Sequence, residues 1–236
     1  MGILTGEEGD PVALENSFAR GDVVIICEHA SRQLPRTLGT LGLSEEALAS
    51  HIAWDPGALA VSRLIAARLD ATLVFQRFSR LVYDCNRPPE SPAAMPEKSE
   101  VFEVPGNAGL DQAARDARTE ALYLPFREKL SGLVKARIAE GRAPVIVTMH
   151  SFTPVYFGKP RAVEIGILHD ADTRLADAML AAGAGGPYDI RRNEPYGPQD
   201  GVTHTLKEHG LANGLANVMI EVRNDLIKDE AGQRVV

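Results

Sequence analysis

Three short runs of apolar, mostly β-branched residues most constrain how this 236-residue chain can fold. They occupy residues 23–27, 145–149 and 218–220. The runs do not alternate between apolar and polar residues, which is typical of strands buried on both faces of a parallel sheet. A polar side chain follows each run within two residues: His29, His150 and Glu221. Because ligands bind at the carboxyl ends of the strands in open α/β sheets, we expect these side chains to meet at one edge.

Two imidazoles and a carboxylate from distant strand ends can hold a catalytic zinc ion and supply the base beside it. The sequence therefore suggests a metallohydrolase. A histidine at a strand end can equally be a hydrogen-bonded structural residue, but the matching positions of His29 and His150 favour a shared role. Of the other histidines, His204 could contact a substrate, whereas His51 and His209 lie in helix-like segments and are expected at the surface.

Composition narrows the class of protein. With 44% apolar and 24% charged residues, the chain suits one globular domain, expected over residues 22–236 after a lead-in, residues 1–21, without defined structure. The 32 acidic residues outnumber the 25 basic ones and give a net charge of −7. A chain with this charge lacks the basic surface that nucleic-acid binding requires. No apolar run reaches the roughly 18 residues of a membrane span, and the N-terminus does not read as a signal peptide. We therefore expect a cytoplasmic protein with no membrane or nucleic-acid partner; the oligomeric state is left open.

The two cysteines, Cys27 and Cys85, lie in apolar segments far apart in the chain. We expect both to be buried, reduced thiols. A metal-binding Cys27 is the alternative, because it would share a strand face with His29.

Helices and strands alternate along the rest of the chain. Helices are predicted after an N-cap at Ser44, from Pro56 to about Leu69, over residues 111–140 with a break at Pro125, and over residues 171–182. Strands are predicted over residues 72–78, 81–84 and 162–169, and a long proline-rich loop over residues 88–109. This alternation predicts an α/β fold in which helices flank a mixed, mostly parallel central sheet.

Several charged residues have a structural and a functional interpretation. Asp55 directly precedes the proline-led helix, so its spacing alone indicates an N-cap. Arg80, Asn86 and Arg87 bracket an apolar run; a guanidinium fork and an amide can hold a small acidic substrate, or Arg80 can pair with a neighbouring aspartate.

Glu221 and Arg223 alternate on one face of the third apolar run. Burying a carboxylate there is costly unless it is paired. Either the two residues pair with each other, or a site uses the acid.

Five motifs, in this order, resemble the N-formylglutamate amidohydrolase family. They are CEHAS at residues 27–31, HIAWDPGA at 51–58, SRLVYDCNRP at 79–88, MHSF at 149–152 and IEVRNDLI at 220–227. The resemblance implies a zinc carboxypeptidase-like (phosphorylase/hydrolase-like) α/β fold, shared with aspartoacylase. It also implies hydrolysis of the amide bond of an N-acyl acidic amino acid, most simply N-formyl-L-glutamate to formate and L-glutamate, as in histidine degradation. Members of the family continue beyond the last motif into a further helix, whereas this chain stops at Val236.

The resemblance also implies roles for single residues. His29 and His150 match metal-binding histidines, and Glu221 matches the catalytic glutamate. In the wider group a carboxylate ligand usually stands three residues after the first histidine, where this chain has Arg32. The family's Trp-Asp-x-Gly-Ala motif therefore makes Asp55 the preferred third ligand, with Glu28 as the alternative. The expected cofactor is one zinc ion, although other divalent metals suit the same ligands.

The remaining assignments concern the substrate. Asn86 and Arg87 match a pair that grips a substrate carboxylate, and Arg80 is a second cation suited to the developing negative charge in catalysis. Arg223 and His204 complete the expected substrate contacts. Two alternatives stay open: a zinc amidohydrolase or carboxypeptidase of the same fold that acts on another N-acyl amino acid or a peptide, and a non-catalytic protein that binds a small acid.

Overall fold

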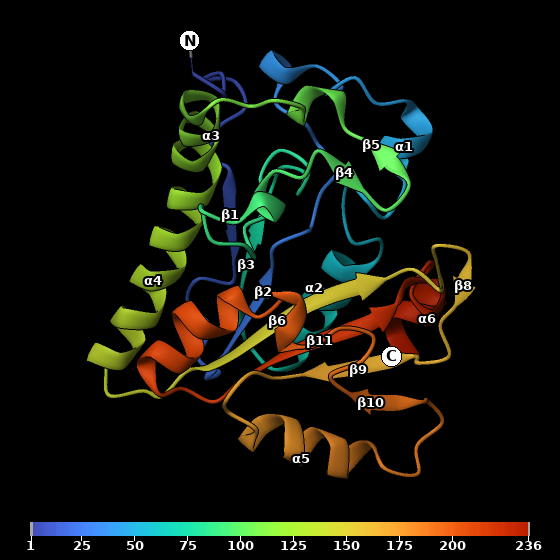
Figure 1. The fold of residues 1–236 in the computed structure, drawn as a ribbon. Coiled ribbons are helices and arrows are strands. Elements are labelled where there is room, and N and C mark those ends of the chain that lie inside the picture. The colour runs from blue at the N-terminus through green and yellow to red at the C-terminus, as the bar shows by residue number, and fades with distance from the viewer. Residues whose placement is uncertain (1, 236) are drawn as a thin grey trace.

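A seven-stranded sheet runs through the centre of the molecule (Figure 1). The computed structural model describes residues 2–235. The strands, in spatial order, are β1 (Val12–Glu15), β3 (Thr72–Gln76), β2 (Val23–Cys27), β6 (Val145–Phe152), β11 (Asn217–Arg223), β9 (Ile165–Leu168) and β10 (Ile190–Arg192). The three apolar runs of the sequence thus form the adjacent strands β2, β6 and β11, as predicted.

The sheet is mixed and mostly parallel. Strands β3, β2, β6 and β11 run parallel to one another, and β9 and β10 run parallel to each other but antiparallel to β11. β1 adds to the β3 edge in the antiparallel direction. The register of β6 and β11 sets His150 opposite Glu221, so the pairing of two predicted site residues follows from the hydrogen-bond ladder.

Helices cover both faces of the sheet and complete three layers (Figure 1). On one face, α2 (Ala58–Arg68) and α5 (Arg174–Gly183) pack on side chains such as Ile25 and Val147. On the other face, α4 (Leu124–Ala139) packs on Ile26 and Ile146. Successive residues of one strand therefore enter different cores, which explains why these strands lack apolar-polar alternation.

The smaller elements lie mainly around the carboxyl ends of the strands. The remaining helices are α1 (Glu45–Ala49), α3 (Gln112–Arg118) and α6 (Glu230–Val235), and two hairpins pair β4 (Lys98–Ser99) with β5 (Phe102–Glu103) and β7 (Val155–Tyr156) with β8 (Lys159–Pro160). The predicted N-cap Ser44 accepts a hydrogen bond from Ala47 N at 3.2 Å and begins α1. No helix among residues 2–235 has the length and apolar character needed to cross a bilayer.

Four predictions about local structure were wrong. The lead-in contains β1, a four-residue edge strand that is too short to show a recognisable hydrophobic pattern in the sequence. Residues 81–84 are buried but form a turn rather than a strand, because this segment carries polar side chains toward the site. The proline-rich loop of residues 88–109 contains the β4–β5 hairpin. The helix expected to split or kink at Pro125 is continuous from Gln112 to Ala139; its irregularity is a π-helical turn, η4 (Thr119–Tyr123), and Pro125 follows in the first turn of α4.

Candidate metal centre

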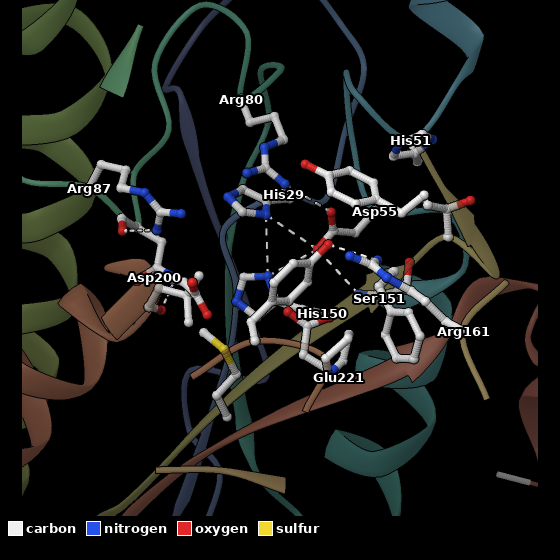
Figure 2. A pocket seen from close by; sticks show the side chains of 18 residues that line it. His29, His51, Asp55, Arg80, Arg87, His150, Ser151, Arg161, Asp200 and Glu221 are labelled. Atoms are coloured by element: carbon white, nitrogen blue, oxygen red, sulfur yellow. Dashed lines mark hydrogen bonds and ion pairs between the residues drawn. The ribbon is translucent and has the colours of Figure 1, made fainter. Parts of the chain in front are cut away.

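Three buried side chains from separate elements converge at the carboxyl ends of the central strands. His29 follows β2 by two residues, His150 lies in β6, and Asp55 precedes α2. The two Nδ1 atoms lie 3.2 Å apart. Asp55 Oδ2 lies 3.2 Å from His29 Nδ1 and 2.9 Å from His150 Nδ1. Figure 2 shows the three side chains pointing toward one another.

The backbone holds Asp55 in this place. Its N–H donates to the His29 carbonyl at 2.9 Å, and its carboxylate accepts a hydrogen bond from Ser151 N at 3.2 Å. The loop before α2 is thereby tied to both histidine-bearing segments.

The start of α2 explains why Asp55 is free to face the centre. The helix begins at Ala58, and its N-cap is Gly57 in the left-handed conformation (φ 83°), without a side-chain cap. A Cβ at Gly57 would lie 2.5 Å from Ile227 O, so the close approach of these backbones requires glycine. The N-cap interpretation of Asp55 was therefore wrong, as was the placement of Pro56 in the first turn.

A buried carboxylate lies behind each imidazole. Asp84 Oδ1 is 2.7 Å from His29 Nε2, and Glu28 Oε2 is 3.1 Å from His150 Nε2 in an ion-pair contact. The Asp84 contact is a hydrogen bond, whereas Glu28 lies at ion-pair distance from His150 Nε2 without hydrogen-bond geometry. Each Nδ1 faces the other histidine and Asp55. Outer carboxylates of this kind fix the tautomer and orientation of metal-binding histidines. Glu28, the alternative ligand, lies on the outer side of His150 rather than among the three converging atoms.

Negative charge dominates the centre. Its four buried carboxylates are Glu28, Asp55, Asp84 and Glu221. Arg80 offsets part of this charge: Nη2 donates to Asp84 Oδ2 at 2.9 Å, and Nη1 lies 3.5 Å from Asp55 Oδ1. Burial by itself would lower the pKa of His150, but the charge of Glu28 and the hydrogen bond with Asp55 outweigh it and hold that pKa well above its ordinary value. The centre thus attracts a further positive charge.

The donor set of the centre suits a divalent metal ion. His29, Asp55 and His150 each offer one ligand atom, and these atoms all lie within 4.8 Å of one another. Two imidazole nitrogens and a carboxylate oxygen form the three-ligand set of catalytic zinc sites that keep a position open. The residues present therefore fit the expected group.

Glu221 lies beside this cluster on β11 and lines the same pocket. Its Oε2 atom is buried and has no hydrogen-bond partner within residues 2–235. Burial raises the pKa of Glu221 to about 7, even though His150 and His29 act in the opposite direction. A carboxylate that is half ionised near neutral pH and free of internal bonds can exchange a proton with a bound molecule.

The cluster forms the floor of a pocket of about 480 Å³. Three guanidinium groups, Arg80, Arg87 and Arg161, line it (Figure 2). Asn86 also reaches the wall, but its Nδ2 donates to Val202 O at 2.6 Å and its Oδ1 accepts from Thr205 N at 3.0 Å. The amide of Asn86 is therefore already bonded to the loop that borders the pocket.

Two expected substrate contacts lie outside this pocket lining. Arg223 pairs with Asp225 at 2.8 Å and Glu164 at 3.4 Å instead of Glu221. His204 Nε2 lies 2.8 Å from the Tyr123 hydroxyl.

Two histidines expected at the surface have other positions. His51 lines the pocket mouth, and its Nε2 lies 2.9 Å from Glu100 Oε2. His209 is buried between its own π-helical segment, η6 (Leu206–Gly210), and α4. The surface prediction was wrong for His209, because a polar helix-like segment can still turn one imidazole inward, whereas His51 is partly exposed.

The cysteines are both free and buried, as expected. Cys27 packs in the core against residues of α2 and does not belong to the convergent cluster, so the alternative metal-binding role was wrong. Burial holds the pKa of the Cys27 thiol well above its ordinary value, and this disfavours the thiolate that a metal requires.

Sequence reasoning missed the parts played by Asp84 and Arg161. Asp84 stands inside the SRLVYDCNRP motif, where its only anticipated partner was an arginine. No sequence pattern marks Arg161, because it lies in the short segment between β8 and β9 and reaches the pocket only through tertiary folding.

Comparison with known proteins identifies the family of this chain. The family model described as N-formylglutamate amidohydrolase matches residues 21–228. A search of curated proteins finds no match.

Two solved structures are similar to this chain. The gene product Atu2144 from Agrobacterium tumefaciens shares 61% sequence identity, with a TM-score of 0.97 over 99% of this chain and 92% of that one. N-formylglutamate amidohydrolase from Ralstonia eutropha JMP134 shares 18% identity, with a TM-score of 0.65 over 95% of this chain and 92% of that one. The second likeness bears on the fold alone.

Proposed function

Because the chain belongs to the N-formylglutamate amidohydrolase family, we propose that it hydrolyses the amide bond of an N-acyl acidic amino acid, with N-formyl-L-glutamate as the first candidate. The products would be formate and L-glutamate. The observation that carries the proposal is the convergence of His29, Asp55 and His150 next to the unpartnered carboxylate of Glu221.

These three residues would hold one divalent metal ion, with zinc as the first candidate. Bound zinc lowers the pKa of water toward neutrality and polarises a carbonyl group, which are the two requirements of amide hydrolysis at neutral pH.

Glu221 serves as the general base and then the general acid. It takes a proton from the attacking water and returns that proton to the leaving amine nitrogen, so the formyl carbon gains an oxygen as the C–N bond breaks. Burial raises the pKa of Glu221, to about 7 in the absence of a metal ion, and a raised pKa makes its carboxylate a stronger base toward the attacking water.

Arg80 and Arg87 act on the charges of the substrate. The side chain of Arg80 is 29% exposed despite its bonds to the two aspartates, so one face remains open to the pocket. We assign it to the negative charge that develops on the carbonyl oxygen. Within residues 2–235 the guanidinium of Arg87 donates only to the Asn86 carbonyl, at 2.9 Å, so it is suited to a substrate carboxylate.

The direct test combines metal content and product formation. Protein purified without a histidine tag is expected to contain about one zinc per chain and to release formate from N-formyl-L-glutamate. Chelation should abolish formate release, and added zinc should restore it. Bound metal without formate release would redirect the search to other N-acyl amino acids or peptides, and absence of both would leave a non-catalytic acid-binding protein.

A matched pair of variants distinguishes the residues that hold the metal from the residue that acts as the base. His150→Ala should lose metal and activity together, whereas Glu221→Gln should keep the metal and lose turnover. Full metal content and full rate in the His150→Ala variant would refute the proposed ligands.

A further inference from the structure

Arg161 lies in the segment between β8 and β9 and lines the pocket over the centre. Three aromatic rings surround its guanidinium: its Cζ atom is 4.3 Å from the centroid of Tyr156, 4.8 Å from that of Tyr196 and 5.6 Å from that of Phe152. Its Nη1 also donates to the Tyr196 hydroxyl at 2.9 Å. The rings fix the plane of the guanidinium without neutralising its charge.

The charge of Arg161 has no internal counterion. Among residues 2–235, no carboxylate forms an ion pair with it, whereas Arg80 is paired with Asp84 and Arg223 with Asp225. A guanidinium held in place by aromatic faces, with unused N–H donors toward a cavity, is suited to bidentate capture of a carboxylate.

A second unpaired guanidinium belongs to Arg87. It also lacks an ion pair within the described part of the chain, and it lies on the opposite side of the His29–His150 cluster from Arg161 in Figure 2. Two cations that are unpaired among residues 2–235 therefore flank the pocket. In an N-acyl acidic amino acid both carboxylates branch from the α-carbon next to the amide nitrogen, so each cation can bind one of them. This arrangement matches a substrate with two carboxylates.

We propose that Arg161, caged by Tyr156, Tyr196 and Phe152, binds one of two carboxylates of the substrate while Arg87 binds the other. Arg161 is thereby the residue that favours the acidic substrates proposed above over N-acyl amino acids with only one carboxylate. This inference rests on the proposed hydrolytic function and extends it to a residue outside the five sequence motifs.

Three substrates test the assignment. N-formyl-L-glutamate has both carboxylates, N-formyl-L-glutamine lacks the side-chain one, and N-formyl-L-isoglutamine lacks the α one. Arg161→Gln should lower kcat/KM by about 10- to 100-fold, mainly through KM, for N-formyl-L-glutamate and for one amide, and leave the rate on the other amide unchanged. Arg87→Gln should show the reverse pattern: the rate should fall on the amide that Arg161→Gln leaves unchanged, and stay unchanged on the amide that Arg161→Gln affects.

Two further variants control for charge and geometry. Lys159→Gln removes a positive charge from the exposed β8 strand, outside the pocket lining, and should change none of the three rates. Arg161→Lys keeps the charge but lacks the fork, so it should fall between the wild type and Arg161→Gln. A uniform loss by Arg161→Gln on all three substrates, or no loss on any, would overturn the proposal.

Binding of glutarate, followed by calorimetry on the metal-free protein, separates this proposal from the proposed reaction. Wild-type protein should bind this dicarboxylate, Lys159→Gln should bind it equally, and Arg161→Gln should bind it at least about 10-fold more weakly. Such a result would support the anion site even if no formyl substrate were hydrolysed. Equal binding by Arg161→Gln, or no binding by the wild type, would overturn it.

Discussion

Each histidine of the centre presents Nδ1 to its neighbours because a buried carboxylate occupies Nε2. Asp84 performs this role for His29 and Glu28 for His150. The two carboxylates contact no other part of the converging donor set. They are positioning residues, and metal affinity depends on them through the histidines they orient.

Replacing Asp84 with its amide tests this dependence. Asp84→Asn keeps the size of the side chain but weakens the charged contact to His29 Nε2, so metal affinity should fall by about 10- to 100-fold. A competition titration with a chromophoric chelator measures this directly. Asp225→Asn, an exposed carboxylate paired only with Arg223, is the control and should leave affinity unchanged. Wild-type affinity in the Asp84→Asn variant would refute the positioning role.

The pKa of Glu221 leads to a prediction for the pH profile. A general base must be ionised, so kcat/KM should rise with pH and level off above the pKa, which burial raises to about 7. A cation bound beside Glu221 favours the ionised form and moves the midpoint below that value. A pH-rate profile with chelated and reloaded samples measures the acid limb. A rate that stays constant from about pH 5 to 8 would show that the pKa of Glu221 is not raised in the metal-bound enzyme.

The predictability of the site depended on where each residue stands in the chain. His29, His150 and Glu221 could be predicted because strand ends in a parallel sheet are determined by short local runs. Asp55 needed the family motif, because its local spacing matches an N-cap equally well. Arg161 could not be predicted, since its cage forms only when the β7–β8 hairpin folds over the centre.

Among the elements, the start of α2 has the strongest influence on the site. Gly57 adopts φ 83°, and its Cα hydrogen faces the Ile227 carbonyl. This glycine lets the chain turn sharply after Asp55, so the carboxylate points to the histidines while the helix leaves in another direction.

Gly57→Ala should therefore destabilise the protein by roughly 2–4 kcal/mol, from left-handed strain and from the clash of the added Cβ with Ile227 O. Gly109→Ala is the matched control, because Gly109 also has a positive φ (64°) but open space around its Cβ position. That change should cost only about 1 kcal/mol. Urea denaturation of both variants measures the difference. Equal costs would mean that the contact with Ile227 is relieved without strain.

The element predictions succeeded for the central strands of the sheet and failed at its edges. β2, β6 and β11 were found because each buries both faces. β1 was missed because an edge strand of four residues receives its stability from pairing with β3, which local sequence does not reveal. Residues 81–84 were taken for a strand because burial in a loop and burial in a sheet select the same apolar residues.

The stability of the folded chain as a whole depends on pH through a residue outside the pocket lining. His209 is buried where η6 meets α4, and its Nδ1 lies 3.5 Å from Ser131 Oγ. Burial lowers its pKa to about 4 from an ordinary value of 6.5, although the nearby charge of Glu208 acts in the opposite direction. The folded protein therefore holds this imidazole neutral in mildly acidic solution.

The sign of the effect follows from proton binding. Above pH 6.5 neither state binds a proton at His209, so its contribution is fully present; between 6.5 and about 4 only the unfolded chain binds one, and stability falls as pH falls. The loss reaches about 3 kcal/mol at the lower limit. His209→Gln should flatten this part of the plot of unfolding free energy against pH, measured by urea denaturation at several pH values. Because the substitution can also shift the whole curve, the slope is the relevant quantity, and a slope equal to that of the wild type would show that other groups cause the acid sensitivity.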